Sequence, residues 1–104
     1  MGYEIAGGWG AKLADPSRDV IVFVGDGSYL MLNSDIYSTV LTGHKMIVIV
    51  CDNGGFSVIN RLQNFKGSAS FNNLLQDCKI ENLQKVNFVQ HATSMGALGE
   101  QVES

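Results

Sequence analysis

Two short apolar runs, each followed at once by small polar residues, constrain the fold of this chain more than any other feature. The first run, VIVFV at 20–24, meets GDGS at 25–28, and the second, MIVIVC at 46–51, meets DNGG at 52–55. Both runs are rich in β-branched residues and apolar at every position, which is typical of parallel strands covered on both faces. The sequence therefore predicts two buried strands, each ending in a turn.

The segment between these runs predicts a crossover helix. Its apolar residues recur at helical spacing: Leu32, Ile36, Tyr37, Val40 and Leu41. A strand, a helix and a second parallel strand form a right-handed crossover, which returns the chain to the same edge of the sheet. Asp26 and Asn53 are therefore expected to be neighbours at the carboxyl ends of two strands, where open α/β sheets bind their ligands.

These two residues have the chemistry of a magnesium site. Asp26 offers a carboxylate oxygen and Asn53 an amide oxygen, and the glycines around them let the backbone approach closely. A small number of oxygen ligands suits Mg²⁺, which completes its octahedron with waters and substrate phosphates. Gly27 and Ser28 open the following helix, where free N–H groups favour a phosphate. Each residue alone also fits an ordinary turn; their pairing at two strand ends favours a diphosphate held through Mg²⁺.

The motif resembles the diphosphate-binding motif of thiamine-diphosphate enzymes: GDG at 25–27, then Asp52-Asn53 after an interval of the right length. This resemblance implies that Asp26, Asn53 and the carbonyl of Gly55 are the protein ligands of Mg²⁺. The family usually has Asn-Asn at the second position, and this chain has Asp52-Asn53. Because the ligand is the second member of the pair, the departure leaves the metal assignment intact.

The same resemblance implies a set of cofactor-binding residues: Met1, Gly27, Ser28, Asn53, Gly55 and Phe56. Gly27 and Ser28 would contact the diphosphate oxygens. Met1 matches the place of a large apolar residue that holds the cofactor in its bent, reactive shape, although an initiator Met of an expressed fragment fits equally well. The family's activating glutamate comes from a separate domain of a partner subunit, and none of the glutamates here matches it. We therefore assign no catalytic residue to this chain.

Length and composition describe one small domain. The chain has 104 residues and a net charge of −3, which argues against nucleic acid, and no apolar stretch reaches membrane-spanning length. Cys51 and Cys78 form no disulfide framework, and Cys51 is expected to be a reduced core thiol in the cytoplasm. The fold class expected for residues 1–104 is α/β: an open, mostly parallel sheet with helices on both faces, forming a single partial thiamine-diphosphate-binding domain.

The remaining segments predict further elements around this unit. Three more helices are expected: one carrying Ile5, Trp9 and Leu13, one over 56–63, and one over 88–95 with Asn87 as its N-cap. Residues 66–73 read as a loop beside the site, and 100–103 as a last strand. His44 is expected at the far end of the second strand, away from the ligands.

Beyond the cofactor motif, nearly the whole chain resembles the trihydroxycyclohexane-1,2-dione hydrolases of myo-inositol catabolism. The matching segments lie at 1–40, 43–56, 59–75 and 88–98. The resemblance implies a C–C bond hydrolase that opens a cyclic dione, with partners in the remaining domains of a longer parent enzyme and in a homo-oligomer. It also implies that this chain is inactive alone.

Two other readings stay open at this point. An acetolactate synthase or a 2-oxoacid decarboxylase would share the cofactor motif, and the segment INRLQNFKG with FNN (59–67 and 71–73) is the feature that discriminates against them. An excised, non-catalytic binding domain would show no turnover even when mixed with a partner that carries the missing domain.

Overall fold

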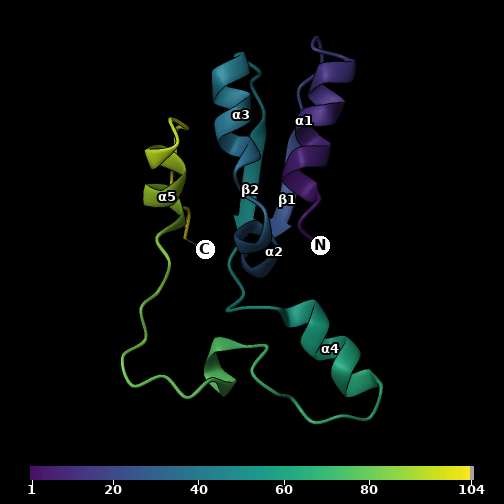
Figure 1. Cartoon of the computed structure of the whole chain (residues 1–104), viewed down its shortest axis with the longest axis vertical. Helices are drawn as coiled ribbons and strands as arrows, with labels where there is room; N and C mark the ends of the chain where they lie inside the picture. The colour runs from purple at the N-terminus through teal and green to yellow at the C-terminus, as the bar shows by residue number, and fades with distance from the viewer. Residues whose placement is uncertain (104) are drawn as a thin grey trace.

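The computed structural model describes residues 1–103. Its sheet has two parallel strands, β1 (Ile21–Gly25) and β2 (Ile47–Cys51), in a register that pairs Gly25 with Cys51 (Figure 1). Both strands agree with the prediction to within one residue. Because the strands are parallel and in register, the residues that follow Gly25 and Cys51 emerge at the same edge of the sheet.

Helices and one short 3₁₀ turn make up the other regular elements of the described chain: α1 (Glu4–Ala14), α2 (Asp26–Met31), α3 (Asp35–Thr42), α4 (Ser57–Phe65), η1 (Leu75–Asp77) and α5 (Phe88–Ser94). In Figure 1, α1 and α3 run beside the strands, α2 lies at their carboxyl ends, and α4 lies beyond that edge. The three further helices predicted from the sequence are confirmed, and the side chain of Asn87 caps α5 by accepting the N–H of Gln90 at 2.8 Å.

The prediction of a single crossover helix between the strands is wrong in detail, because the structure has two helices there. Leu32 has extended backbone angles that end α2, and α3 begins at Asp35. The side-chain amide of Asn33 donates to the carbonyl oxygen of Tyr29 at 3.1 Å. Asn33 thereby satisfies a carbonyl that a continuing helix would have used, and it separates the short site helix α2 from the longer packing helix α3.

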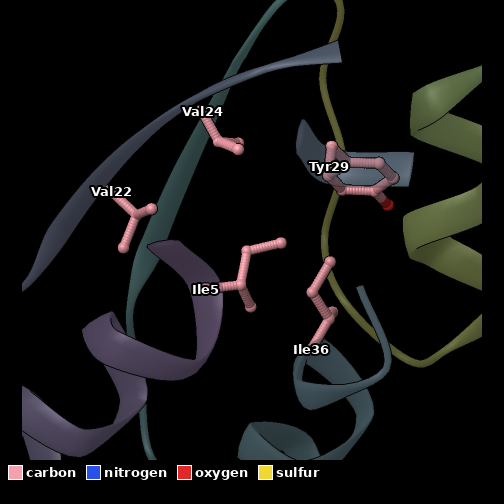
Figure 2. Close-up of a cluster of buried hydrophobic side chains, with 5 residues drawn as sticks. All are labelled: Ile5, Val22, Val24, Tyr29 and Ile36. Carbon is pink, nitrogen blue, oxygen red and sulfur yellow. The ribbon is translucent and has the colours of Figure 1, made fainter. Parts of the chain in front are cut away.

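A small apolar cluster holds α1, α2 and α3 against one face of the sheet. Its buried members, drawn in Figure 2, are Ile5, Val22, Val24, Tyr29 and Ile36. Val22 and Val24 alternate with exposed residues along β1, as the two-residue period of a strand requires. Ile5 and Tyr29 are each only 1% exposed, so α1 and α2 contribute the most deeply buried side chains of the cluster.

The opposite face of the sheet is uncovered in the described residues. The side chains on it are exposed: Ile21 (55%), Phe23 (67%), Ile47 (44%) and Ile49 (39%). The expected α/β class with parallel strands is confirmed, but the helices of this chain cover one face and not both. The radius of gyration, 15.5 Å, exceeds the roughly 13 Å of a compact domain of this length, in keeping with so much uncovered apolar surface.

Two smaller expectations need correction. Cys51 is exposed because it lies in register with the uncovered residues of β2, so it is not a core thiol. Residues 100–103 form no strand. His44 does lie at the amino end of β2, away from the carboxyl edge, as expected. None of the helices in the described chain is both long and apolar enough to cross a membrane.

Candidate cofactor site

The site is built where the two strands end. Asp26 follows the last residue of β1, begins α2 and is only 4% exposed. Its Oδ2 accepts the backbone N–H of Gly55 at 2.6 Å, across 29 positions of sequence. The loop after β2 is therefore tied directly to the carboxylate after β1, as the crossover topology predicts.

The side-chain amide of Asn53 meets both of these residues. One terminal atom of this amide lies 3.0 Å from the carbonyl oxygen of Gly55 and 3.1 Å from Oδ1 of Asp26. An amide fills the same space in either orientation. With its nitrogen at that position, Asn53 donates hydrogen bonds to the two oxygens. With its oxygen there, it accepts from the hydroxyl of Ser57 at 2.6 Å, and the amide oxygen lies close to both of the other oxygens.

Gly55 has a conformation that other residues avoid. Its φ is +130°, and a Cβ built on it would lie 2.5 Å from the backbone oxygen of Asn73. An isolated antiparallel bridge pairs Gly55 with Leu74, so the site loop is packed against a second stretch of backbone. Only glycine combines this backbone angle with so close an approach.

A pocket of about 180 Å³ opens beside these groups. Its lining comes from α1, the strand ends and the start of α4: Met1, Glu4, Gly25, Gly27, Ser28, Asn53, Gly55, Phe56, Ser57 and Val58. All six residues predicted to bind the cofactor are in this set, and Asp26 is buried next to it. The structure thus brings the predicted site residues together, while their contact with a cofactor stays a prediction.

Phe56 and Gly27 face each other in this pocket. A Cβ on Gly27 would lie 2.7 Å from Cδ1 of the Phe56 ring and 3.2 Å from the carbonyl oxygen of Gly55. The missing side chain at position 27 therefore lets the ring of Phe56 pack directly against the first turn of α2.

Sequence reasoning missed the role of Glu4 in this pocket. The hydroxyl of Ser28 lies 2.9 Å from both carboxylate oxygens of Glu4, to which it donates, and it accepts the N–H of Gly2 at 2.7 Å. Burial raises the pKa of the Glu4 carboxyl, but hydrogen bonds from its own backbone N–H, from Ser28 and from Gly2 act in the opposite direction, and the pKa lies below its ordinary value. One signal was available: Glu4 is the only charged residue among the first eleven.

A larger hollow of about 600 Å³ lies elsewhere, lined by Phe71, Asn72, Asp77, Cys78 and Lys79. It is an open depression between two loop segments, and it does not contain the strand ends. Among the described residues there is also no group of three His, Cys, Asp or Glu side chains able to hold a metal. A metal ligand set in the described residues therefore has to draw on an amide or a backbone carbonyl, and the smaller pocket offers both, from Asn53 and Gly55, beside the buried carboxylate of Asp26.

An α/β crossover with a buried carboxylate after one strand and an Asn-Gly-Gly loop after the next defines a class of proteins that bind a phosphorylated cofactor at the carboxyl edge of a sheet. Within this class the assignment is specific. The chain belongs to the family described as thiamine pyrophosphate enzyme, C-terminal TPP binding domain, whose model matches residues 1–104. Thiamine pyrophosphate is another name for thiamine diphosphate, so the family expected from the sequence is confirmed.

Individual relatives are also similar. Over 71 residues, 68% of this chain, it is 51% identical to a protein of Geobacillus thermodenitrificans (strain NG80-2) named 3D-(3,5/4)-trihydroxycyclohexane-1,2-dione hydrolase. Proteins with that name in Bacillus thuringiensis (strain Al Hakam) and Bacillus cereus (strain AH820) show the same identity over the same length. The match covers 11% of the length of each relative, so this chain corresponds to a small part of those proteins.

Proposed function

We propose that this chain binds the diphosphate of thiamine diphosphate through Mg²⁺, with Asp26, Asn53 and the backbone carbonyl of Gly55 as the protein ligands. Thiamine diphosphate, when bound, supplies the electron sink for cleaving a C–C bond. The residues of this chain hold and orient its diphosphate end. Gly27 and Ser28 offer the N–H groups of the first turn of α2 to the phosphate oxygens, and Phe56 and Met1 contribute apolar walls.

The approach of the Asn53 amide to two other oxygens carries this proposal. The outer atom of the Asn53 amide lies 3.0 Å from the Gly55 carbonyl oxygen and 3.1 Å from Oδ1 of Asp26. Neighbouring ligands of an octahedral Mg²⁺, each 2.0–2.1 Å from the ion, are about 2.9 Å apart. The two distances from the Asn53 amide therefore match the spacing of neighbouring ligands on one octahedron, which would leave other positions for diphosphate oxygens and water.

For the parent protein we propose hydrolysis of a C–C bond in a trihydroxylated cyclohexane-dione, within inositol catabolism. The names of relatives that are 51% identical support this substrate class. The chain by itself is expected to be inactive, because the activating glutamate of the family comes from a separate domain of a partner subunit and Glu4, the one glutamate lining the pocket, does not match its position. The remaining domains of a cytoplasmic homo-oligomer would supply the acid–base groups and cover the apolar sheet face.

Calorimetric titration of the full-length protein with thiamine diphosphate, with and without Mg²⁺, tests the metal proposal. We expect binding to require Mg²⁺ and the Asp26→Ala variant to lose it. Asp52→Ala is the matched control. Asp52 is the neighbour of Asn53, but it is not one of the proposed ligands, because its carboxylate accepts the N–H of Gly54 at 3.1 Å. Equal losses in the two variants, or binding that needs no divalent cation, would contradict the proposal.

The substrate proposal has a separate test. The full-length protein, loaded with thiamine diphosphate and Mg²⁺, should consume a cyclic trihydroxylated dione and should act weakly or not at all on pyruvate. The reverse preference would favour an acetolactate synthase or a 2-oxoacid decarboxylase. No turnover of any of these substrates would favour a non-catalytic binding protein.

A further inference from the structure

The chain that leaves the site returns to it. From Phe56 it runs through α4 and a polar loop and comes back at residues 73–75, which lie against the site loop (Figure 1). Two backbone hydrogen bonds join the segments: Phe56 N–H donates to the carbonyl of Asn73 at 2.7 Å, and Leu75 N–H donates to the carbonyl of Gly54 at 2.9 Å. Residues 54–56 are therefore held from both sides, by Asp26 and by the returning segment.

The bond from Phe56 to Asn73 has a direct effect on a proposed metal ligand. The N–H of Phe56 and the carbonyl of Gly55 belong to the same peptide unit, and in a planar trans peptide these two groups point in opposite directions. Because the N–H points to Asn73, the Gly55 carbonyl points away from it, to within 3.0 Å of the Asn53 amide. The direction of that carbonyl is thus held by Asn73 through the Phe56 N–H, together with the N–H of Ser57, which donates to the carbonyl at 3.1 Å.

The side chain of Asn73 is fixed in turn by α4. Its amide donates to Oε1 of Gln63, and Nε2 of Gln63 donates to the carbonyl of Ala69 in the loop. Both side chains are partly buried, and both ends of the Gln63 amide are used. Gln63 is thus bonded to the loop at one end and to the returning segment at the other.

We propose that Gln63 and Asn73 are positioning residues that tune the cation site for Mg²⁺. They act through the Phe56–Asn73 backbone bond, which aims the Gly55 carbonyl at the ion. This inference rests on the proposed function, and it adds a role for the segment INRLQNFKG with FNN (59–67 and 71–73) that the ligand set does not include. The chemistry involved is cation selectivity: Mg²⁺ requires near-ideal octahedral geometry, whereas the larger Ca²⁺ accepts longer and less regular contacts.

The test is the affinity of the full-length protein for Mg²⁺ and for Ca²⁺, each titrated calorimetrically at a saturating concentration of thiamine diphosphate. Gln63→Leu keeps the helix propensity and approximate size of the side chain but removes both hydrogen bonds. We expect it to weaken Mg²⁺ binding about 10- to 100-fold, the usual range for groups that orient metal ligands. Ca²⁺ binding should weaken by a clearly smaller factor, so that the preference for Mg²⁺ declines.

Asn64→Ala is the matched control. Asn64 is the next residue of α4, and its amide bonds the hydroxyl of Ser70 in the same loop, but it makes no bond to residues 73–75. It should leave both cation affinities within about twofold of the unchanged protein, since its loss loosens the loop without releasing Asn73. If Asn64→Ala and Gln63→Leu have the same effect, the loop as a whole is important and the proposal is wrong.

A second variant separates positioning from folding. Asn73→Ala removes the other partner of the side-chain hydrogen bond between Asn73 and Gln63. The double variant Gln63→Leu/Asn73→Ala should therefore bind Mg²⁺ no more weakly than the more affected single variant. Additive losses of affinity in the double variant, or equal losses for Mg²⁺ and Ca²⁺, would overturn the proposal.

The Asp26→Ala protein, titrated in parallel, distinguishes a failure of the proposed ligand set from a failure of the proposed positioning role. If it still binds Mg²⁺ normally, the ligand assignment itself is wrong; if it loses Mg²⁺ while Gln63→Leu does not, only the positioning role fails.

Discussion

The backbone N–H of Gly55 donates to the carboxylate of Asp26 over 2.6 Å and so joins the ends of β1 and β2. Asp26 is 4% exposed, and a carboxylate this buried requires hydrogen bonds or a cation to offset the loss of water. Gly55 supplies one such bond. The same residue also presents a carbonyl to the converging oxygens, so one glycine both supports and completes the candidate site.

Gly55→Ala should disrupt this arrangement. The new Cβ would lie 2.5 Å from the carbonyl oxygen of Asn73, at a φ of +130° that alanine rarely adopts. Strain of this kind costs about 1–3 kcal/mol before any clash is counted. We expect a lower thermal midpoint for the full-length protein and loss of its Mg²⁺-dependent binding of thiamine diphosphate, both measurable by calorimetry.

Gly54→Ala is the control for that experiment. Gly54 also has a positive φ, +80°, but nothing lies within 4 Å of a Cβ built on it. It should share the conformational cost and keep most of the cofactor affinity. If the two variants lose cofactor binding equally, backbone strain in the loop is the cause and the close contact with Asn73 is not.

A second pair of glycines tests the packing of α1 on the sheet. A Cβ on Gly8 would lie 2.3 Å from Cγ2 of Val22, whereas a Cβ on Gly10 would meet nothing within 4 Å. Gly8→Ala should push α1 from β1 and destabilise the domain by about 1–3 kcal/mol. Gly10→Ala should stabilise it by about 0.5–1 kcal/mol, since alanine favours a helix. Amide hydrogen exchange in β1 would report both effects, and faster exchange in Gly10→Ala would contradict the packing argument.

The sequence predicted the two strands, and the meeting of Asp26 with the loop after β2, because these depend on local patterns. The β-branched run at 20–24 and the turn residues that follow it act within a few positions, and a parallel crossover then requires the two strand ends to meet. The six residues predicted to bind the cofactor line one pocket, although Met1 and Phe56 were placed by family resemblance and not by periodicity. Their contact with a cofactor stays a prediction.

What the sequence did not predict depends on contacts between distant segments. The break at Asn33 requires its amide to reach the carbonyl of Tyr29, and helical spacing continues through that break without a sign of it. The bond between Glu4 and Ser28 joins residues 24 positions apart. Apolar residues on the uncovered face of the sheet, such as Phe23, were predicted to be buried but are exposed. Hydrophobicity indicates what a residue prefers to contact, and it does not show whether this chain supplies the contact.

The bond between Glu4 and Ser28 predicts a pH dependence. The pKa of Glu4 is lower in the folded protein than its ordinary value of 4.5, so the carboxylate adds stability above that pH and loses the addition as the pH falls through the folded pKa. Compared with the Glu4→Gln variant, the unchanged protein should have a higher thermal midpoint at pH 7, and the difference should shrink below about pH 4.5. Glu81→Gln, at an exposed loop carboxylate, should leave the midpoint at pH 7 unchanged. A difference for Glu4→Gln that grows on acidification would contradict the sign.

One buried phenol contributes to the attachment of α5. Tyr29 is 1% exposed, its Oη lies 2.9 Å from Nδ1 of His91, and its ring packs edge-on against Phe88 at a centroid distance of 5.3 Å. Burial raises the pKa of Tyr29, so the phenol stays protonated and able to form this bond at neutral pH. Tyr29→Phe keeps the ring contact and removes the hydrogen bond, which is worth about 1 kcal/mol.

We therefore expect the amides of α5 in Tyr29→Phe to exchange about fivefold faster, the factor that corresponds to about 1 kcal/mol, while the β1 amides stay unchanged. Tyr37→Phe is the control, because Tyr37 is 50% exposed on α3. Since α2 carries both Tyr29 and the candidate diphosphate contacts Gly27 and Ser28, the same variant also tests whether α5 supports the site. Unchanged exchange in α5 would mean that the aromatic packing alone holds this helix. Weaker binding of thiamine diphosphate would mean that the hydrogen bond to His91 also helps to fix α2.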